Sequence, residues 1–141
     1  MRLFTCGYSK LAKAKAEFRT SLKDFNLAPI KPTITPDVLE QIDVRVGTTE
    51  LVEEVPRPDK LVRLMVDFGD HKRKILAELR QERANPQEIE GKQAFFIVNL
   101  PPRKMMGEVS EGMLFDIGYS NGIMLVLAVP EKKVPNGSRV S

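Results

Sequence analysis

The residues best suited to chemistry lie in one stretch, residues 99–113, which reads NLPPRKMMGEVSEGM. Arg103 and Lys104 follow two prolines, which restrict the backbone and fix the direction of the two cations. Ser110 adds a hydroxyl donor, and Met113 adds a polarizable side chain that could meet a base. Phosphate contact is the obvious use of such a basic pair. The stretch therefore predicts a site that binds a polyanion.

Each of these residues also has a structural interpretation. Arg103 could pair with a carboxylate, Ser110 could form a turn, and Met113 could belong to the core. Asn99 precedes the basic pair, and Lys60, in the segment PDKL, could bind the ligand or pair with a nearby aspartate. The candidate binding residues are thus Lys60, Asn99, Arg103, Lys104, Ser110 and Met113.

Catalysis and metal binding are not expected. The sole histidine, His71, lies in a charged DHKRK turn, and the sole cysteine, Cys6, lies near the N-terminus. The sequence therefore suggests no catalytic nucleophile with a general base beside it. One cysteine cannot form an internal disulfide or a thiolate zinc site within one chain. We predict a protein that is not an enzyme and needs no cofactor.

The elements that must position the binding residues are short β runs. Strands are expected at residues 42–55, 61–69, 72–80, 92–100 and 110–118, with a brief helical turn at 85–91 and a closing apolar run at 122–130. The predicted fold class is all-β with minor helices: the strand order fits a five-stranded oligonucleotide-binding (OB-fold) barrel over residues 42–141, and another small barrel would also fit it. Asp43 and Arg45 are two residues apart and are expected to point outward from the same face of the first strand, so we predict that they form a cross-strand ion pair.

Residues 1–41 read as an N-terminal helical extension. Residues 9–25 place apolar side chains at helical spacing against a basic face, which predicts an amphipathic helix that packs on the barrel or a second subunit, contacts RNA, or serves as a targeting segment. A proline-rich linker follows, and Thr35 can cap a short helix that has Pro36 at its first position.

Charge and hydropathy limit the partners. The formal charge of +3 arises from residues 1–41, with seven Lys or Arg against four acids, whereas residues 42–141 carry fifteen of each. A neutral barrel can bind RNA only through a local basic patch. No apolar stretch approaches the roughly 20 residues of a membrane span, and no secretory signal is evident, so we expect a soluble cytoplasmic protein without membrane insertion.

The motifs resemble one family. DVRVG at 43–47, PDKL at 58–61, VDFG at 66–69 and the run at 99–113 occur in the order and spacing of the stand-alone tRNA-binding domain. PPR within that run and the terminal VPNGSRV look most similar to the CsaA-like homodimers. The resemblance implies an OB-fold, tRNA as partner, a homodimer, and either tRNA binding or an export-related chaperone activity.

Four positions depart from the family pattern. Val55 stands where the family has a histidine and Pro58 where it has a small residue, and Ala77 and Glu78 stand where it has a Ser-Gly pair. Glu78 would reduce phosphate affinity by about 1 kcal/mol if it pointed toward the groove.

Few aromatic residues are available to stack on bases. The chain has no Trp and two Tyr, and Phe95, Phe96 and Phe115 sit inside apolar runs expected to be core. We therefore predict recognition of a folded RNA by shape and backbone. The alternative is a peptide-binding chaperone with a methionine-lined groove, whose partner would be an unfolded polypeptide or a secretion factor. A module that carries tRNA to a synthetase is a third possibility.

Overall fold

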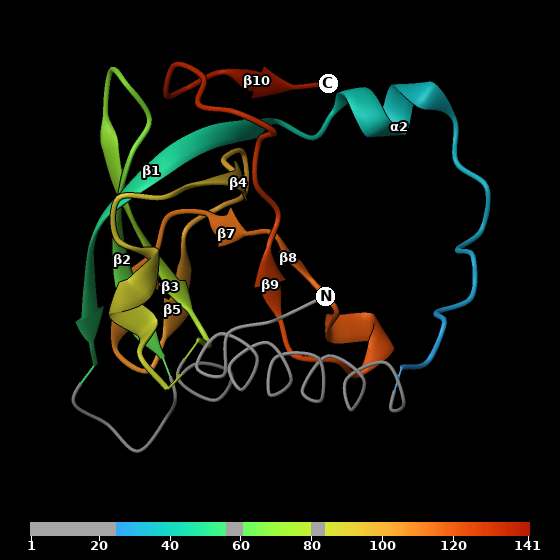
Figure 1. The fold of residues 1–141 in the computed structure, drawn as a ribbon. Coiled ribbons are helices and arrows are strands. Elements are labelled where there is room, and N and C mark those ends of the chain that lie inside the picture. Colours follow the sequence, from blue (N-terminus) through green and yellow to red (C-terminus); the bar gives the residue numbers. More distant parts are fainter. Residues whose placement is uncertain (1–24, 56–60, 80–83) are drawn as a thin grey trace, which may run out of the picture. The chain divides into compact units, whose positions relative to one another are not determined.

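The computed structural model describes residues 25–55, 61–79 and 84–141 (Figure 1). The amphipathic helix predicted over residues 9–25 lies outside this part of the chain, except for Phe25. Lys60 lies outside it as well. Among the residues described, no helix has both the length and the apolar character required to span a bilayer.

The chain divides into two compact units. The described part of the smaller unit consists of residues 25–31 and Gly118–Val126, and it contains the 3-10 turn η2 (Tyr119–Asn121). The backbone nitrogen of Asn26 donates to the carbonyl of Asn121 (3.0 Å), and Nδ2 of Asn121 donates to the carbonyl of Asn26 (2.7 Å). This reciprocal pair ties the two segments of the smaller unit together.

The larger unit comprises Pro32–Ile117 and Leu127–Ser141 and is mostly β. Apart from η2, the elements in chain order are α2 (Pro36–Glu40), β1 (Val44–Glu54), β2 (Val62–Asp67), β3 (Lys72–Ala77), η1 (Pro86–Ile89), β4 (Gln93–Ile97), β5 (Arg103–Met105), β6 (Glu108–Ser110), β7 (Met113–Leu114), β8 (Asp116–Ile117), β9 (Val126–Leu127) and β10 (Arg139–Val140).

Five antiparallel strands, in the order β3-β2-β1-β4-β7, make a barrel that is nearly closed, and β10 pairs with the start of β1 (Figure 1). β1 has 11 residues, so it pairs with β4 through its first half and with β2 through its second. It can approach β2 closely because residue 47 is glycine: a Cβ atom there would lie 2.6 Å from Cγ1 of Val66. The barrel therefore depends on Gly47 for its curvature.

The core follows the alternation seen in the sequence. Val62, Leu64 and Val66 of β2 point inward and are fully buried, whereas the residues between them are half-buried. Phe96 of β4 is also fully buried and meets the ring of Phe68 edge-on, with centroids 5.5 Å apart. Alternating apolar residues thus place one face of each strand in a shared interior.

The open edge of the barrel closes along what we call the seam, formed by Lys74 and Leu76 of β3 with Ser110 and Glu111. The amide of Glu111 donates to the carbonyl of Lys74 (2.8 Å). The Leu76 amide donates to Oγ of Ser110 (3.0 Å), and the Lys74 amide donates to Oε1 of Glu111 (3.1 Å). Side chains therefore replace part of the backbone ladder at the seam.

Most of the predicted elements are confirmed. β1 to β4 lie within the predicted ranges, η1 occupies the predicted helical turn, and α2 begins at Pro36. Thr35 holds the N-cap position, but its side chain makes no capping hydrogen bond. The predicted fifth strand is broken into β7 and β8. The hairpin of β5 and β6 was not predicted, and it carries the candidate site.

Candidate nucleic-acid interface

The basic pair lies on the β5–β6 hairpin. Arg103 pairs with Ser110, Lys104 with Val109, and Met105 with Glu108, so Met106 and Gly107 alone form the turn. Their φ angles are 54° and 82°, the left-handed pair that a two-residue hairpin turn of this kind requires. Met106 is the only non-glycine residue with a positive φ in the described part of the chain. The turn is therefore strained at one position.

Two contacts fix the hairpin on the barrel. Arg63 of β2 approaches Oε1 of Glu108 with Nη2 at 2.6 Å and Nε at 2.7 Å. The hydrogen bond to Glu108 raises the pKa of Arg63 above its ordinary value, with burial opposing the rise. At the base of the hairpin, Ser110 bonds to Leu76 across the seam. Arg63 thereby neutralises the charge of Glu108, and the two contacts hold the hairpin near its tip and at its base.

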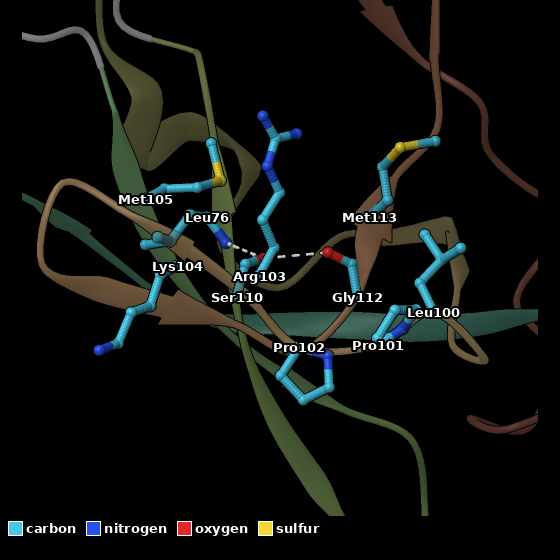
Figure 2. A pocket seen from close by; sticks show the side chains of 10 residues that line it. All are labelled: Leu76, Leu100, Pro101, Pro102, Arg103, Lys104, Met105, Ser110, Gly112 and Met113. Atoms are coloured by element: carbon cyan, nitrogen blue, oxygen red, sulfur yellow. Dashed lines mark hydrogen bonds between the residues drawn. The ribbon is translucent and has the colours of Figure 1, made fainter.

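Arg103 and Lys104 are both exposed, and no ion pair joins either of them to a carboxylate among the described residues. Neighbouring residues of a strand point to opposite faces. Figure 2 shows this arrangement, with the Arg103 guanidinium and the Lys104 ammonium directed away from each other. The hairpin thus presents one exposed cation on each of the two faces of β5.

A groove of about 550 Å³ lies at the base of the hairpin. Its apolar lining consists of Leu76, Leu100, Pro101, Pro102, Met105 and Met113, and Arg103, Lys104, Ser110 and Gly112 complete it (Figure 2). Met113 is 46% exposed, so the interpretation of this residue as core is wrong. None of these lining residues is aromatic. The groove offers cations and a methionine surface but no stacking platform.

Ser110 is in the groove wall, but its hydroxyl is occupied. The side chain is buried, accepts a hydrogen bond from the Leu76 amide and donates one to the carbonyl of Gly112 at 3.0 Å (Figure 2). A hydroxyl has a single proton to donate. Ser110 therefore holds the groove together in this structure.

Asn99 acts as a clip between β4 and the segment before β1. Its Oδ1 accepts from the Asp43 amide (2.9 Å), and its Nδ2 donates to the Gln41 carbonyl (2.7 Å). Both ends of the amide are engaged, so Asn99 positions the loop that leads to Pro101 and Pro102.

The departures from the family pattern have different structural consequences. Val55 is buried and packs with Leu61 and Leu76 in a small cluster that also contacts Met105. This apolar cluster supports the floor of the groove where the family has a histidine. Glu78 is exposed and is not among the residues that line the groove.

Asp43 and Arg45 form the predicted ion pair, but along one strand. Nε of Arg45 lies 2.8 Å from Oδ1 of Asp43, and Nη2 lies 3.1 Å from Oδ2. Arg139 of β10 supplies the cross-strand contact at 3.3 Å. Hydrogen bonding to Arg45 first, and then to Arg139, holds the pKa of Asp43 below its ordinary value despite some desolvation.

Two functional contributions were missed at the sequence level. Arg63 and Glu108 are far apart in the chain, and nothing in their local sequence predicts that one anchors the other. Glu111 is not among the predicted binding residues, yet it supplies two hydrogen bonds to the seam. Glu111 lies between Ser110 and Gly112, and this local sequence does not indicate a contact with β3.

The sequence family agrees with this geometry. A family model described as "Putative tRNA binding domain" matches residues 44–139, which include most of the barrel and the whole hairpin. The chain belongs to this family.

Relatives of this tRNA-binding domain occur within synthetases. The chain is 40% identical over 117 residues to a methionine–tRNA ligase of Parabacteroides distasonis, and the match covers 83% of the chain. The aligned part is 17% of that ligase, so the chain spans about a sixth of the length of this relative.

Solved structures of similar shape include two proteins whose full length is covered. A MetRS-related protein from Pyrococcus horikoshii superposes with a TM-score of 0.72 at 32% identity over 79% of this chain. The chaperone CsaA from Bacillus anthracis superposes with a TM-score of 0.68 at 26% identity over 78% of this chain. Both the tRNA-related and the CsaA-like resemblance expected from the motifs are therefore confirmed.

Proposed function

We propose that this protein is a non-catalytic tRNA-binding protein, active in the cytoplasm, whose OB-fold barrel receives the backbone of a folded RNA at the β5–β6 hairpin. The observation that carries the proposal is the pair of exposed cations, Arg103 and Lys104, on an anchored hairpin at the mouth of the groove. Family membership supplies the class of ligand.

The directions in which the Arg103 and Lys104 side chains point favour contact with two phosphates of the RNA over contact with one. Because Arg103 and Lys104 point to opposite faces of the strand, they contact different phosphates of one ligand. Arg103 offers a planar fork that can hold two phosphate oxygens, and Lys104 offers a point charge. Met113 then contacts a sugar or base edge, while Asn99 and Ser110 keep the groove in shape. Lys60 is proposed as a further contact from its sequence position.

The lining of the groove favours a folded RNA over an unstructured strand. Stacking on aromatic side chains dominates general single-strand binding, and no aromatic side chain lines this groove. Phe96 is fully buried, and Phe95 and Phe115 are half-buried. Recognition by the groove would therefore rely on the shape of a folded RNA and on contacts with its backbone.

The test is equilibrium binding across a salt series to folded bulk tRNA and to unfolded RNA of equal length. Arg103→Ala/Lys104→Ala should reduce the slope of log K against log salt by about 2, one for each lost phosphate contact. Lys31→Ala/Lys72→Ala is the charge-matched control, because neither residue lines the groove and the Lys72 ammonium is already paired with Glu50 at 3.0 Å. Equal tRNA affinity in the wild type and the double variant would contradict the proposal.

A peptide-binding chaperone is the second candidate. It is favoured by the apolar lining of the groove, in which Met105 and Met113 offer adaptable contacts. If one groove serves both ligands, an unfolded polypeptide and tRNA should compete. Tight, salt-insensitive polypeptide binding with negligible tRNA affinity would favour the chaperone instead.

We also propose a homodimer. Large apolar side chains are exposed in both units: Tyr119, Met124 and Val126 in the smaller one, and Ile117 in the larger one. Such surfaces are commonly covered by association. A second copy would add a second hairpin and raise avidity for one RNA without new contacts. Light scattering at micromolar concentration should report twice the chain mass, and a monomer would contradict this proposal.

A further inference from the structure

A second hollow, of about 360 Å³, lies away from the groove and is rich in lysine. Lys92 contributes from the residue just before β4, and Lys132 and Lys133 contribute from the segment between β9 and β10. Thr48 and Gln93 supply polar side chains to the same hollow. Three ammonium groups around one concavity favour an anionic ligand.

Both walls of this hollow are held in place. The carbonyl of Lys92 accepts from the Thr49 amide (3.1 Å), and the Gly91 amide donates to the Thr49 carbonyl (2.7 Å), so Lys92 is fixed to β1. On the other wall, Nε2 of Gln93 donates to the Val134 carbonyl (2.6 Å), and Oε1 accepts from the Val134 amide (3.1 Å). Lys132 and Lys133 directly precede the residue that Gln93 holds.

The lysines are available to a ligand. All three are exposed, and within the described part of the chain no ion pair joins any of them to a carboxylate. Glu131 is the one acid beside them in sequence, and it is exposed. The Oε1 atom of Glu90, nearby in sequence, already accepts a hydrogen bond from the Val52 amide at 3.2 Å. The three lysines therefore outnumber the two nearby acids, Glu90 and Glu131, and give the hollow a net positive charge.

The hollow is distinct from the groove. The two share no lining residue. Lys92 and Gln93 stand at the first end of β4, whereas Leu100 and Pro101 follow its other end. At about 3.3 Å per residue, the two sites are on the order of 20 Å apart along the strand direction. One folded RNA is large enough to reach both.

We propose that Lys92, Lys132 and Lys133 form a second contact site for the phosphate backbone of RNA, which a folded tRNA occupies together with the groove. The proposal rests on the proposed function, and it deepens it by assigning a second site. The lysine ammonium groups act as point charges toward phosphate, without reading bases, so the site adds affinity and not sequence preference. A short RNA cannot reach both sites, whereas a folded tRNA can.

The test compares tRNA binding by Lys132→Gln/Lys133→Gln with the charge-matched control Lys31→Gln/Lys72→Gln. The first variant should lose tenfold or more in affinity at about 0.1 M salt, and its slope of log K against log salt should fall by about 2. The control should change both quantities far less, although the net charge is the same. Glu131→Gln removes the acid next to Lys132 in sequence and should strengthen binding.

The outcomes separate this site from the groove. Suppose that the wild type binds tRNA and that Arg103→Ala/Lys104→Ala weakens this binding. If Lys132→Gln/Lys133→Gln and its control Lys31→Gln/Lys72→Gln then bind tRNA equally well, the second site is refuted and the groove remains the RNA site. If the wild type binds no tRNA, the proposed function itself fails. Loss of binding to vesicles of anionic phospholipid with unchanged tRNA binding would also overturn the RNA assignment.

Discussion

Removal of the Ser110 hydroxyl separates a structural role from a ligand role. In Ser110→Ala, the Leu76 amide and the Gly112 carbonyl each lose a partner at 3.0 Å. A buried polar group left unpaired costs about 1–3 kcal/mol. Leu76 is buried, and Gly112 is half-buried and can regain some hydration. We therefore expect a loss of about 2–4 kcal/mol in the free energy of unfolding, a large part of an ordinary domain's stability.

The assay is urea and thermal unfolding beside tRNA binding. For a chain of this size, each kcal/mol lowers Tm by about 4 °C, so Tm should fall by about 8–16 °C. Ser138→Ala is the control, because the Ser138 hydroxyl makes one bond, to the Pro135 carbonyl at 2.6 Å, in an exposed setting. It should cost less than about 1 kcal/mol.

Binding measured well below both transitions decides between the roles. A variant that is less stable but still binds tRNA supports Ser110 as a seam residue. Unchanged stability together with a loss of tRNA affinity would refute this reasoning and make Ser110 a direct RNA contact.

Two further predictions concern the turn and the ion pair. Met106→Asn should stabilise the protein by about 0.5–1 kcal/mol in urea unfolding, because asparagine tolerates the positive φ at this turn, and Met106→Val should destabilise it; an asparagine variant no more stable than the valine one would contradict this. Because the folded pKa of Asp43 is lowered from 3.8, its ionised form stabilises the protein above that pH, and this contribution is lost as the pH falls from 3.8 through the folded value. The stability difference between wild type and Asp43→Asn should therefore shrink on acidification, and a constant difference from pH 7 to pH 2 would count against the ion pair.

The barrel was predictable because its strands carry their own pattern. Residues 61–69 form a short, largely apolar run between turn signals, which identifies β2, whereas its buried face of Val62, Leu64 and Val66 is set by the pleat of the strand. The β5–β6 hairpin carries no such pattern: its outward residues are charged, and its turn is Met-Gly where Asn-Gly would be the usual signal. Local sequence therefore could not identify it.

The candidate site was predictable in location but not in the role of each residue. Arg103 and Lys104 are exposed as expected, since a cation without a nearby acid stays in solvent. Ser110 and Asn99 are committed to distant backbone groups, Leu76 and Gln41, and such contacts depend on the register between strands far apart in the sequence. The lysine hollow was missed for the same reason, because Lys92 and Lys132 meet only in the folded chain.

The seam and the turn divide the hairpin into parts with unequal tolerance for change. Insertion beside Ser110 or Glu111 would shift the hydrogen bonds that close the barrel, so chain length there is fixed. Lengthening at Met106 and Gly107 would disturb neither those bonds nor the Arg63 contact to Glu108. New loops grafted at this tip should therefore alter which ligands the protein selects while the barrel folds as before, which makes the hairpin tip the natural place to engineer specificity.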